Sequence, residues 1–155
     1  MHRLAARALG LGAITGLRSM SAPAAVSRAA AHGRLGSLEG TPLEALGSAR
    51  AARLLTVLEI GELIGDKLPI TPSRTALPPL LGRAASGALA GAALFASEGR
   101  RMALGGALGA AGALASARAG ERLRMQISQR LGVPDFVPAL VEDGIVLFAS
   151  SRLTR

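Results

Sequence analysis

The sequence contains no cysteine, tryptophan or tyrosine, and only three phenylalanines among its 155 residues. Without cysteine the chain forms no disulfide, no thiolate metal site and no cysteine nucleophile. The lack of tyrosine and tryptophan removes the side chains that usually stack on nucleic-acid bases. The scarcity of large aromatic groups also argues against a core filled by interdigitating bulky side chains, as in most soluble domains.

Charged residues are also scarce. Only 18% of the chain is charged and half is hydrophobic, whereas about 25% of a typical soluble domain is charged. The ten acidic residues are outnumbered by seventeen arginines and one lysine, which gives a net charge of +8. The arginines are spread near the ends of apolar segments, a pattern that favours the surface of a lipid bilayer over nucleic acid as the partner.

The apolar segments predict an all-α fold, because no stretch shows convincing strand alternation. The length fits one membrane domain, residues 1–155. We expect residues 33–48 and 68–82 to be connectors, the second because its prolines oppose helix continuation. Residues 83–130 are expected to form a helical hairpin. The predicted helices cover residues 4–17, 24–33, 49–67, 83–98, 101–130 and 138–151.

Long uncharged runs are missing as well. The longest, Ala84–Ser97 and Met102–Ala117, fall short of the ~20 apolar residues of a standard membrane span. The helices could be short spans with arginines reaching the interface, or half-helices that turn back within the protein. A soluble alanine-rich bundle is the alternative. We favour a polytopic membrane helical bundle with short or broken, Gly/Ala-rich helices.

The basic residues suggest an orientation for the expected hairpin. Its flanks, residues 67–83 and 118–130, hold seven lysines and arginines, whereas its tip holds Arg100 and Arg101. Because positively charged flanks stay in the cytoplasm, the flank side is expected to be cytoplasmic.

The first residues have a second interpretation. Residues 8–17 could be the apolar part of a signal peptide, with "SAPA" as its cleavage site. Arg18 directly behind the apolar run and the many glycines and alanines within it argue against cleavage.

Glycine, in contrast, is abundant, with 20 residues. Gly-x-x-x-Gly occurs once in each of four expected helices. Residues four apart share a helix face, and glycine leaves a flat groove into which a second helix can pack. We interpret these pairs as helix-packing sites, within the chain or between the copies of a homo-oligomer, with compositional bias as the alternative. The pairs are Gly12/Gly16, Gly61/Gly65, Gly87/Gly91 and Gly105/Gly109.

The acids are concentrated in an otherwise apolar stretch, "EIGELIGDKLPITPSR", residues 59–74. Its first three acids have spacings of three and four and therefore line one helix face. Carboxylates are untenable against lipid, so this face must meet protein, water or cations. We expect Lys67, Arg74 and Arg18 as partners, and a second acid pair lies in the last helix. The polar candidates are Arg18, Glu59, Glu62, Asp66, Lys67, Arg74, Glu142 and Asp143.

These residues support two main hypotheses. In a small transporter or channel-like protein, Glu62, Asp66 and Glu142 would carry a proton, ion or small polar solute, and the basic residues would balance them. In a structural membrane protein the same residues would form a static ion-pair lock. A membrane enzyme acting on a lipid or phosphate group comes third, because no nucleophile motif, metal spacing or nucleotide fingerprint is present. We expect no catalytic residue, metal or cofactor.

Three stretches resemble a known family: "GLRSMSAP" (16–23), "GELIGDKLPITPSRTALPPLLGRAASGALAGAAL" (61–94) and "VEDGI" (141–145). The chain is similar over most of its length to domain-of-unknown-function family 4126, a group of small bacterial integral membrane proteins. The resemblance implies a multi-pass protein of the bacterial inner membrane with several helices. It implies no activity. The residues that carry it are Gly16, Arg18, Pro23, Glu62, Gly65, Asp66, Lys67, Pro69, Thr71, Pro72, Arg74, Gly82, Glu142 and Asp143.

Overall fold

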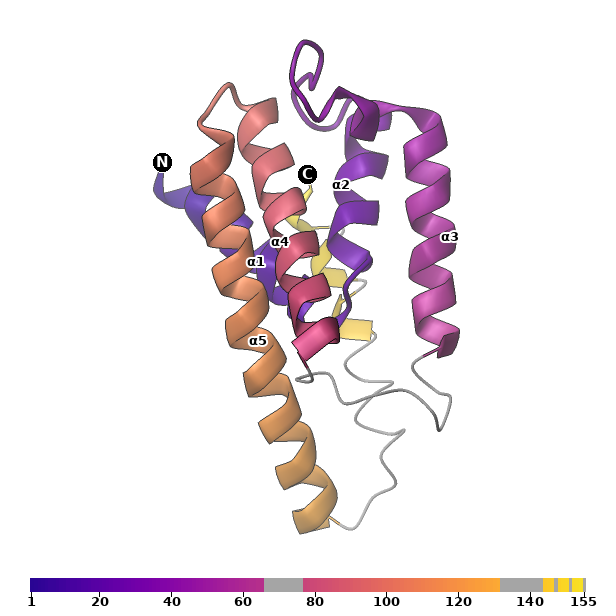
Figure 1. The fold of residues 1–155 in the computed structure, drawn as a ribbon, viewed down its shortest axis with the longest axis vertical. Coiled ribbons are helices and arrows are strands. Elements are labelled where there is room, and N and C mark those ends of the chain that lie inside the picture. Colours follow the sequence, from indigo (N-terminus) through magenta and orange to yellow (C-terminus); the bar gives the residue numbers. More distant parts are fainter. Residues whose placement is uncertain (66–76, 132–143, 147, 151, 155) are drawn as a thin grey trace.

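The computed structural model describes residues 1–65, 77–131, 144–146, 148–150 and 152–154 (Figure 1). Within these ranges the regular structure is helical and contains no strand, so the predicted all-α class is confirmed for them. The elements are α1 (His2–Leu17), α2 (Ser21–Ala31), the short 3-10 helix η1 (Glu44–Gly47), α3 (Ala49–Gly65), α4 (Leu77–Ser97) and α5 (Met102–Leu131).

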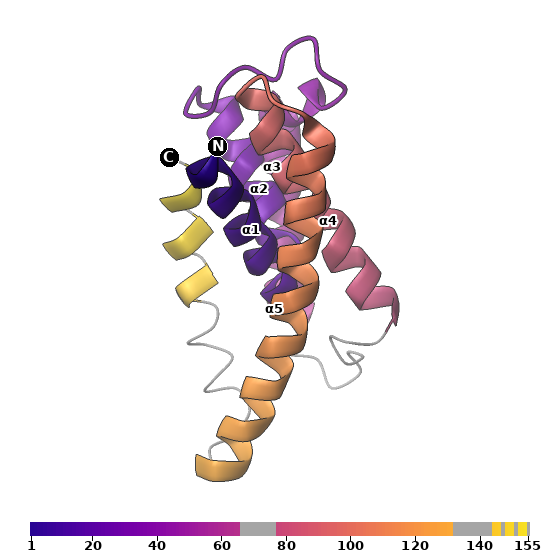
Figure 2. The same cartoon turned by 90° about the vertical axis from the view of Figure 1, so that its left-hand side faces the viewer.

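The helices run alternately down and up along the long axis of the molecule (Figures 1 and 2). We call the end with the α1–α2 turn the lower end, and the end with the α4–α5 turn the upper end. Helices α1, α4 and α5 pack against one another, and α2 packs against both α4 and α3. Helix α3 therefore lies at one side of the bundle, with α2 between it and the other helices (Figure 1).

Prolines lie inside two helices, where the sequence predicted breaks. Pro23 occupies the first turn of α2, and Pro78 and Pro79 occupy the first turn of α4. The first turn of a helix has no intrahelical acceptor for its N–H groups, so proline is tolerated there. Residues 77–82 consequently belong to α4, although the sequence predicted a connector over 68–82. The rest of that connector, residues 68–76, lies outside the described residues.

Helix α4 is the one helix among the described residues that is long and apolar enough to cross a membrane. It has 21 residues, close to the ~20 that a bilayer needs. Slightly more than half of its apolar stretch is buried inside the protein, as in the core helix of a soluble bundle. Helix α4 alone therefore gives only weak support to a membrane location.

Helices α4 and α5 run antiparallel and are joined by a tight turn at Glu98–Arg101. Gly99 takes a positive φ of 62°, which glycine adopts without strain. The N–H of Arg100 donates to the carbonyl of Phe95 at 2.8 Å and closes the turn. The start of α4 and the second half of α5 both lie toward the lower end, where α5 extends beyond the other helices (Figures 1 and 2).

The three-helix group of α1, α4 and α5 is held together by backbone approach at glycines. A Cβ built on Gly109 would overlap the carbonyl oxygen of Gly87 on α4, and one built on Gly12 would overlap that of Gly109. Gly91 and Gly105 face each other in the same way. No larger residue fits at these positions without moving a helix, because the nearest atoms belong to rigid backbone.

Three of the four Gly-x-x-x-Gly pairs face a neighbouring helix, and the Gly61/Gly65 pair of α3 does not among the described residues. Gly16, the partner of Gly12 in its pair, faces Ala113 and Ser116 of α5. No described atom other than those of α3 itself and its chain neighbours lies within 4 Å of a Cβ built on Gly61 or Gly65. Gly61, which is exposed, is therefore open on the described surface of α3.

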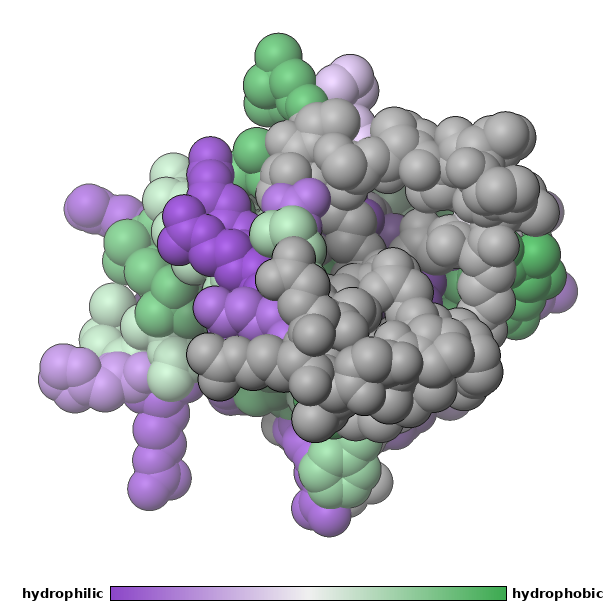
Figure 3. Space-filling model, turned by 90° about the horizontal axis from the view of Figure 1, so that it is seen from below, coloured by the Kyte–Doolittle hydropathy of each residue, from purple (hydrophilic) through white to green (hydrophobic). Residues whose placement is uncertain are grey.

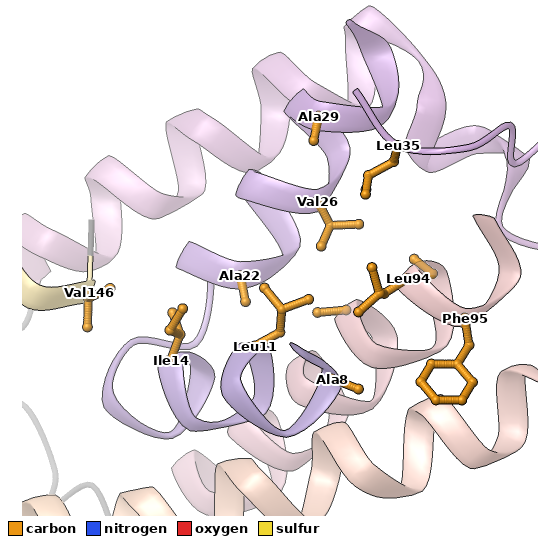
Figure 4. Packing of buried hydrophobic residues seen from close by; sticks show 12 residues of the cluster. Ala8, Leu11, Ile14, Ala22, Val26, Ala29, Leu35, Leu94, Phe95 and Val146 are labelled. Atoms are coloured by element: carbon orange, nitrogen blue, oxygen red, sulfur yellow. The ribbon is translucent and has the colours of Figure 1, made fainter. Parts of the chain in front are cut away.

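The apolar core is small and lies between α1, α2 and α4. Figure 4 shows Leu11 of α1 between Ala22 of α2 and Leu94 of α4. Phe95 is fully buried and also lies against Gly105 of α5. The described parts of the expected last helix, residues 138–151, are helical, and their Val146 joins this core.

Gly109→Ala is expected to lower the free energy of unfolding by about 1–3 kcal/mol, because the new methyl group overlaps the Gly87 carbonyl. Gly61→Ala is the matched control. It is expected to be neutral or to stabilise by up to ~1 kcal/mol, because alanine favours a helix and meets no described atom there. Denaturant unfolding in detergent measures both. Equal effects of the two changes would contradict the packing assigned to Gly109.

Candidate functional site

Helix α3 turns Thr56 and Glu59 inward and five of its large apolar side chains outward. Thr56 and Glu59 follow Ala52 at spacings of four and three residues, so the three share one face, and this face meets α2. Glu59 is only 4% exposed. The large apolar side chains that are exposed on the remaining surface are Leu54, Val57, Leu58, Ile60 and Ile64.

The first polar contact between α2 and α3 is an ion pair. The Nη1 of Arg28 lies 2.8 Å from Oε2 of Glu59 and donates a hydrogen bond to it. The same nitrogen donates to Oγ1 of Thr56 at 2.9 Å. Because Arg28 is one third exposed, its charge is partly solvated while that of Glu59 is not. The pair therefore satisfies a carboxylate that would be very costly to bury alone.

The second oxygen of this carboxylate is in a different situation. Oε1 of Glu59 is buried and has no hydrogen-bond partner among the described residues. A bidentate arginine–carboxylate pair would use both oxygens, whereas Arg28 uses one. Glu59 thus keeps a buried acceptor at the interface of α2 and α3 that no described residue uses.

The second polar contact joins α3 to the beginning of α2 at the lower end. Oε1 of Glu62 accepts the N–H of Ser19 at 2.7 Å, and Oε2 accepts the N–H of Met20 at 2.8 Å. Met20 directly precedes α2 and makes no side-chain cap of its own. The start of a helix carries unpaired N–H groups and a partial positive charge, so a carboxylate is stabilising there. Glu62 therefore caps α2 from another helix.

Arg18 lies in the turn that Glu62 contacts and is only 1% exposed. Its backbone is extended and ends α1, while its N–H still donates to the carbonyl of Ile14 at 2.8 Å. A buried guanidinium keeps its charge in proteins and requires polar surroundings. Two of the polar candidates, Arg18 and Glu62, thus lie at the same turn.

The structure reassigns the partners of the two described acids. The sequence named Lys67, Arg74 and Arg18 as partners, but Glu59 pairs with Arg28. Arg28 is the only charged residue of α2, and a lone charge in an apolar helix was the available signal. The polar candidates that lie outside the described residues are Asp66, Lys67, Arg74, Glu142 and Asp143.

The described part of the chain offers few other groups that could form a metal or ligand site. No group of three or more His, Asp or Glu residues close enough to hold a metal occurs there. An open hollow of about 450 Å³ lies at the upper end, lined mainly by residues 33–48. One of its two glutamates, Glu44, accepts the N–H of Gly40 at 3.1 Å. The hollow is therefore at the opposite end from Glu62 and shares no residue with the polar candidates.

The family model described as "Domain of unknown function (DUF4126)" matches residues 5–152. The chain belongs to this family. The match covers nearly the whole sequence, including all polar candidates and all four glycine pairs, and agrees with the resemblance found in the motifs. No curated protein and no solved structure matches the chain. Its function is therefore argued from its own geometry.

A double-mutant cycle of Arg28→Met and Glu59→Gln is expected to give a coupling energy of about 1–3 kcal/mol. Arg28→Met should be the more damaging single change, because it leaves a buried carboxylate unpaired. The free energy of unfolding in detergent is the readout, and Glu98→Gln at the exposed hairpin tip is the control. Additivity of the two changes within ~0.5 kcal/mol would show that the pair is not coupled.

Proposed function

We propose that this protein is an integral membrane protein in which the acids of α3 fasten α3 to α2 within the bilayer. The observation that carries this proposal is that α3 exposes large apolar side chains and buries a glutamate. Leu54, Val57 and Ile64 are 60–64% exposed, whereas Glu59 on the opposite face is 4% exposed. Contiguous exposed apolar surface of this kind marks a protein or membrane contact.

The exposed apolar side chains of α3 would be unfavourable in water. Full burial of a Leu, Ile or Val side chain is worth about 1.5–3 kcal/mol, so leaving five such chains exposed to water wastes several kcal/mol. In lipid the same face is at no disadvantage, and carboxylates must turn inward. Figure 3, seen from the lower end, shows hydrophobic side chains at the edge where α3 lies in Figure 1. The arrangement supports lipid as the surroundings of α3.

The dimensions of this face favour a short membrane helix. Leu54 to Ile64 covers eleven residues, or roughly 16 Å at 1.5 Å per residue, which is less than the ~30 Å core of a bilayer. Arg50 and Arg53 are exposed at the upper end of α3 and could reach the headgroups with their long side chains. We extend the proposal to a multi-pass protein with several short helices and with its lower end in the cytoplasm.

The two contacts of α3 support a structural role for its described acids. Glu59 is paired with Arg28 and Glu62 caps α2, so both carboxylates bind the fixed groups of a neighbouring helix. Such contacts are strong in a medium without competing water. A static lock between α2 and α3 is therefore the role that the described geometry supports best.

A small transporter or channel-like protein for a proton, ion or small polar solute is the second candidate function. It is favoured by Oε1 of Glu59, a buried acceptor that has no partner among the described residues. An acceptor of this kind could receive a proton or a hydrogen bond from a passing solute. The enzyme hypothesis, which named Glu62 and Asp66 as acid/base groups, stays a prediction.

The membrane proposal predicts that the protein stays in the envelope fraction after alkaline washing and is released only by detergent. The substitution Val57→Lys distinguishes a lipid-facing from a water-facing surface of α3. On a lipid-facing surface a lysine costs about 2.5–3.5 kcal/mol, so the yield of membrane-inserted protein should fall, whereas a water-facing lysine would be harmless. Arg53→Lys, nearby on α3, is the control. A wild-type chain that is a compact monomer in the detergent-free supernatant would disprove the proposal.

Charge-neutral substitutions separate the lock from a pathway. If the acids form a pathway, Glu59→Gln, Glu62→Gln and Asp66→Asn should abolish proton flux into liposomes while leaving the protein folded. If they form a lock, the first two should reduce the amount of folded protein instead. A pH-sensitive dye inside the vesicles measures flux, and circular dichroism measures folding. Normal flux in all three folded variants would exclude the pathway.

A homo-oligomer formed through a glycine face is part of the same proposal. Gly61 supports it, because it is exposed and no described atom outside α3 lies near it, while the other three pairs face helices of the same chain. The molar mass of the detergent-solubilised protein, measured by light scattering, gives the number of copies, and a monomer would contradict this part.

A further inference from the structure

We propose that the lower part of α5 is a binding surface for anionic phospholipids, on which Arg118 and Arg122 bind the phosphate group. The inference rests on the membrane location that the proposed function assigns, and it adds the chemical class of lipid that the protein recognises. Three features carry it: two exposed arginines on one face of α5, an exposed apolar strip directly above them, and exposed apolar side chains beside them.

The two arginines are four residues apart and therefore share a face of α5. Both are exposed, and neither forms an ion pair with a described residue. Nη1 of Arg118 donates a long hydrogen bond of 3.4 Å to the carbonyl of Leu114 in its own helix. Most N–H donors of the two guanidinium groups thus point to the surroundings. Arginine suits a phosphate, because its planar group donates two parallel hydrogen bonds.

The same face of α5 is apolar above the arginines. Leu104, Ala107, Ala111 and Ala115 follow one another at spacings of three and four residues, and all four are exposed. We call these four residues the apolar strip. The two arginines continue the series downward at the same spacings. A strip of apolar residues that ends in two cations matches the polarity of an anionic phospholipid, whose acyl chains lie deeper in the membrane than its phosphate.

The length of the uncharged part of α5 places the arginines at the membrane surface. No charged residue lies between Arg101 and Arg118. These seventeen positions correspond to roughly 26 Å at 1.5 Å per residue, close to the ~30 Å core of a bilayer. When Arg101 lies at the upper headgroup layer, Arg118 and Arg122 lie at the lower one. Helix α5 extends beyond the other helices at this end, so the pair is not covered by the bundle (Figure 2).

Large apolar side chains lie beside the arginines. Leu123 is 57% exposed and Met125 is 51% exposed. Cations interleaved with exposed apolar side chains are typical of helices in the membrane interface, where the apolar groups enter the acyl chains and the cations bind headgroups. Residues 118–131 contain four arginines and a single acid, Glu121. The lipid that complements this part of α5 is therefore anionic.

Quenching of a fluorophore beside the arginines tests this surface. The chain has no cysteine, so Ala119→Cys gives a single labelling position next to both arginines. The labelled full-length protein is reconstituted in phosphatidylcholine vesicles with a small fraction of spin-labelled phosphatidylglycerol or spin-labelled phosphatidylcholine. Phosphatidylglycerol should be preferred at the label by about fivefold for each arginine, because no choline offsets its phosphate charge.

Removal of the two charges should abolish the preference. In Arg118→Gln with Arg122→Gln, both spin-labelled lipids should quench the label equally. Arg100→Gln with Arg101→Gln is the matched control, because it removes two exposed arginines at the upper end, and it should leave the preference unchanged. If the lower double variant does not fold, each single Gln substitution should still lower the preference about fivefold. Lysine at both lower positions keeps the charge and should retain part of the preference.

A second label separates this inference from the proposed function on which it rests. Ala107→Cys lies on the apolar strip and should be quenched by both lipids alike. No quenching at this position would overturn the membrane location, and this inference with it. Quenching there without a preference for phosphatidylglycerol at Ala119→Cys would overturn the inference alone. Equal loss of the preference in the lower and upper double variants would do the same, because it would show a general effect of net charge.

Discussion

The close approach of backbones at glycine is the constraint on which the rest of this structure depends. Gly12, Gly87, Gly91, Gly105 and Gly109 bring α1, α4 and α5 into direct contact. Helices this close bury their surfaces without large side chains, so dispersion between backbone atoms replaces a bulky core. This explains how a chain with three phenylalanines and no other aromatic residue forms a bundle.

The other side of the molecule is joined on a different principle. Between α2 and α3 the contacts are an ion pair, two backbone hydrogen bonds to Glu62 and a hydroxyl at Thr56. Polar contacts specify direction and register, whereas glycine contacts specify closeness. The described bundle thus combines a tightly packed part with a part that is fixed by a few directional bonds. The polar candidates that the structure describes, Arg18 aside, belong to the second part.

Periodicity and composition predicted the class of the fold and most of the helices, because these depend on local sequence. Helices α4 and α5 are of this kind. The starts of α2 and α4, each with proline in its first turn, were missed, because a proline that ends a helix and one that lies in its first turn look alike in the sequence. The partners of Glu59 and Glu62 were missed because Arg28 and the backbone of Met20 lie in a segment far away in sequence.

The distance in sequence between these partners has a consequence for biosynthesis. The N–H groups of Ser19 and Met20 bind the carboxylate of Glu62, which is synthesised 43 and 42 residues later. The carbonyl of Ala13 accepts a hydrogen bond from the hydroxyl of Ser116, which is synthesised 103 residues later. Gly12 contacts α5 at a similar separation in sequence. Helix α1 thus leaves the ribosome long before its permanent neighbours exist. During that interval its glycine groove is not yet covered by α5, and the synthesis of α5 completes the packing of α1.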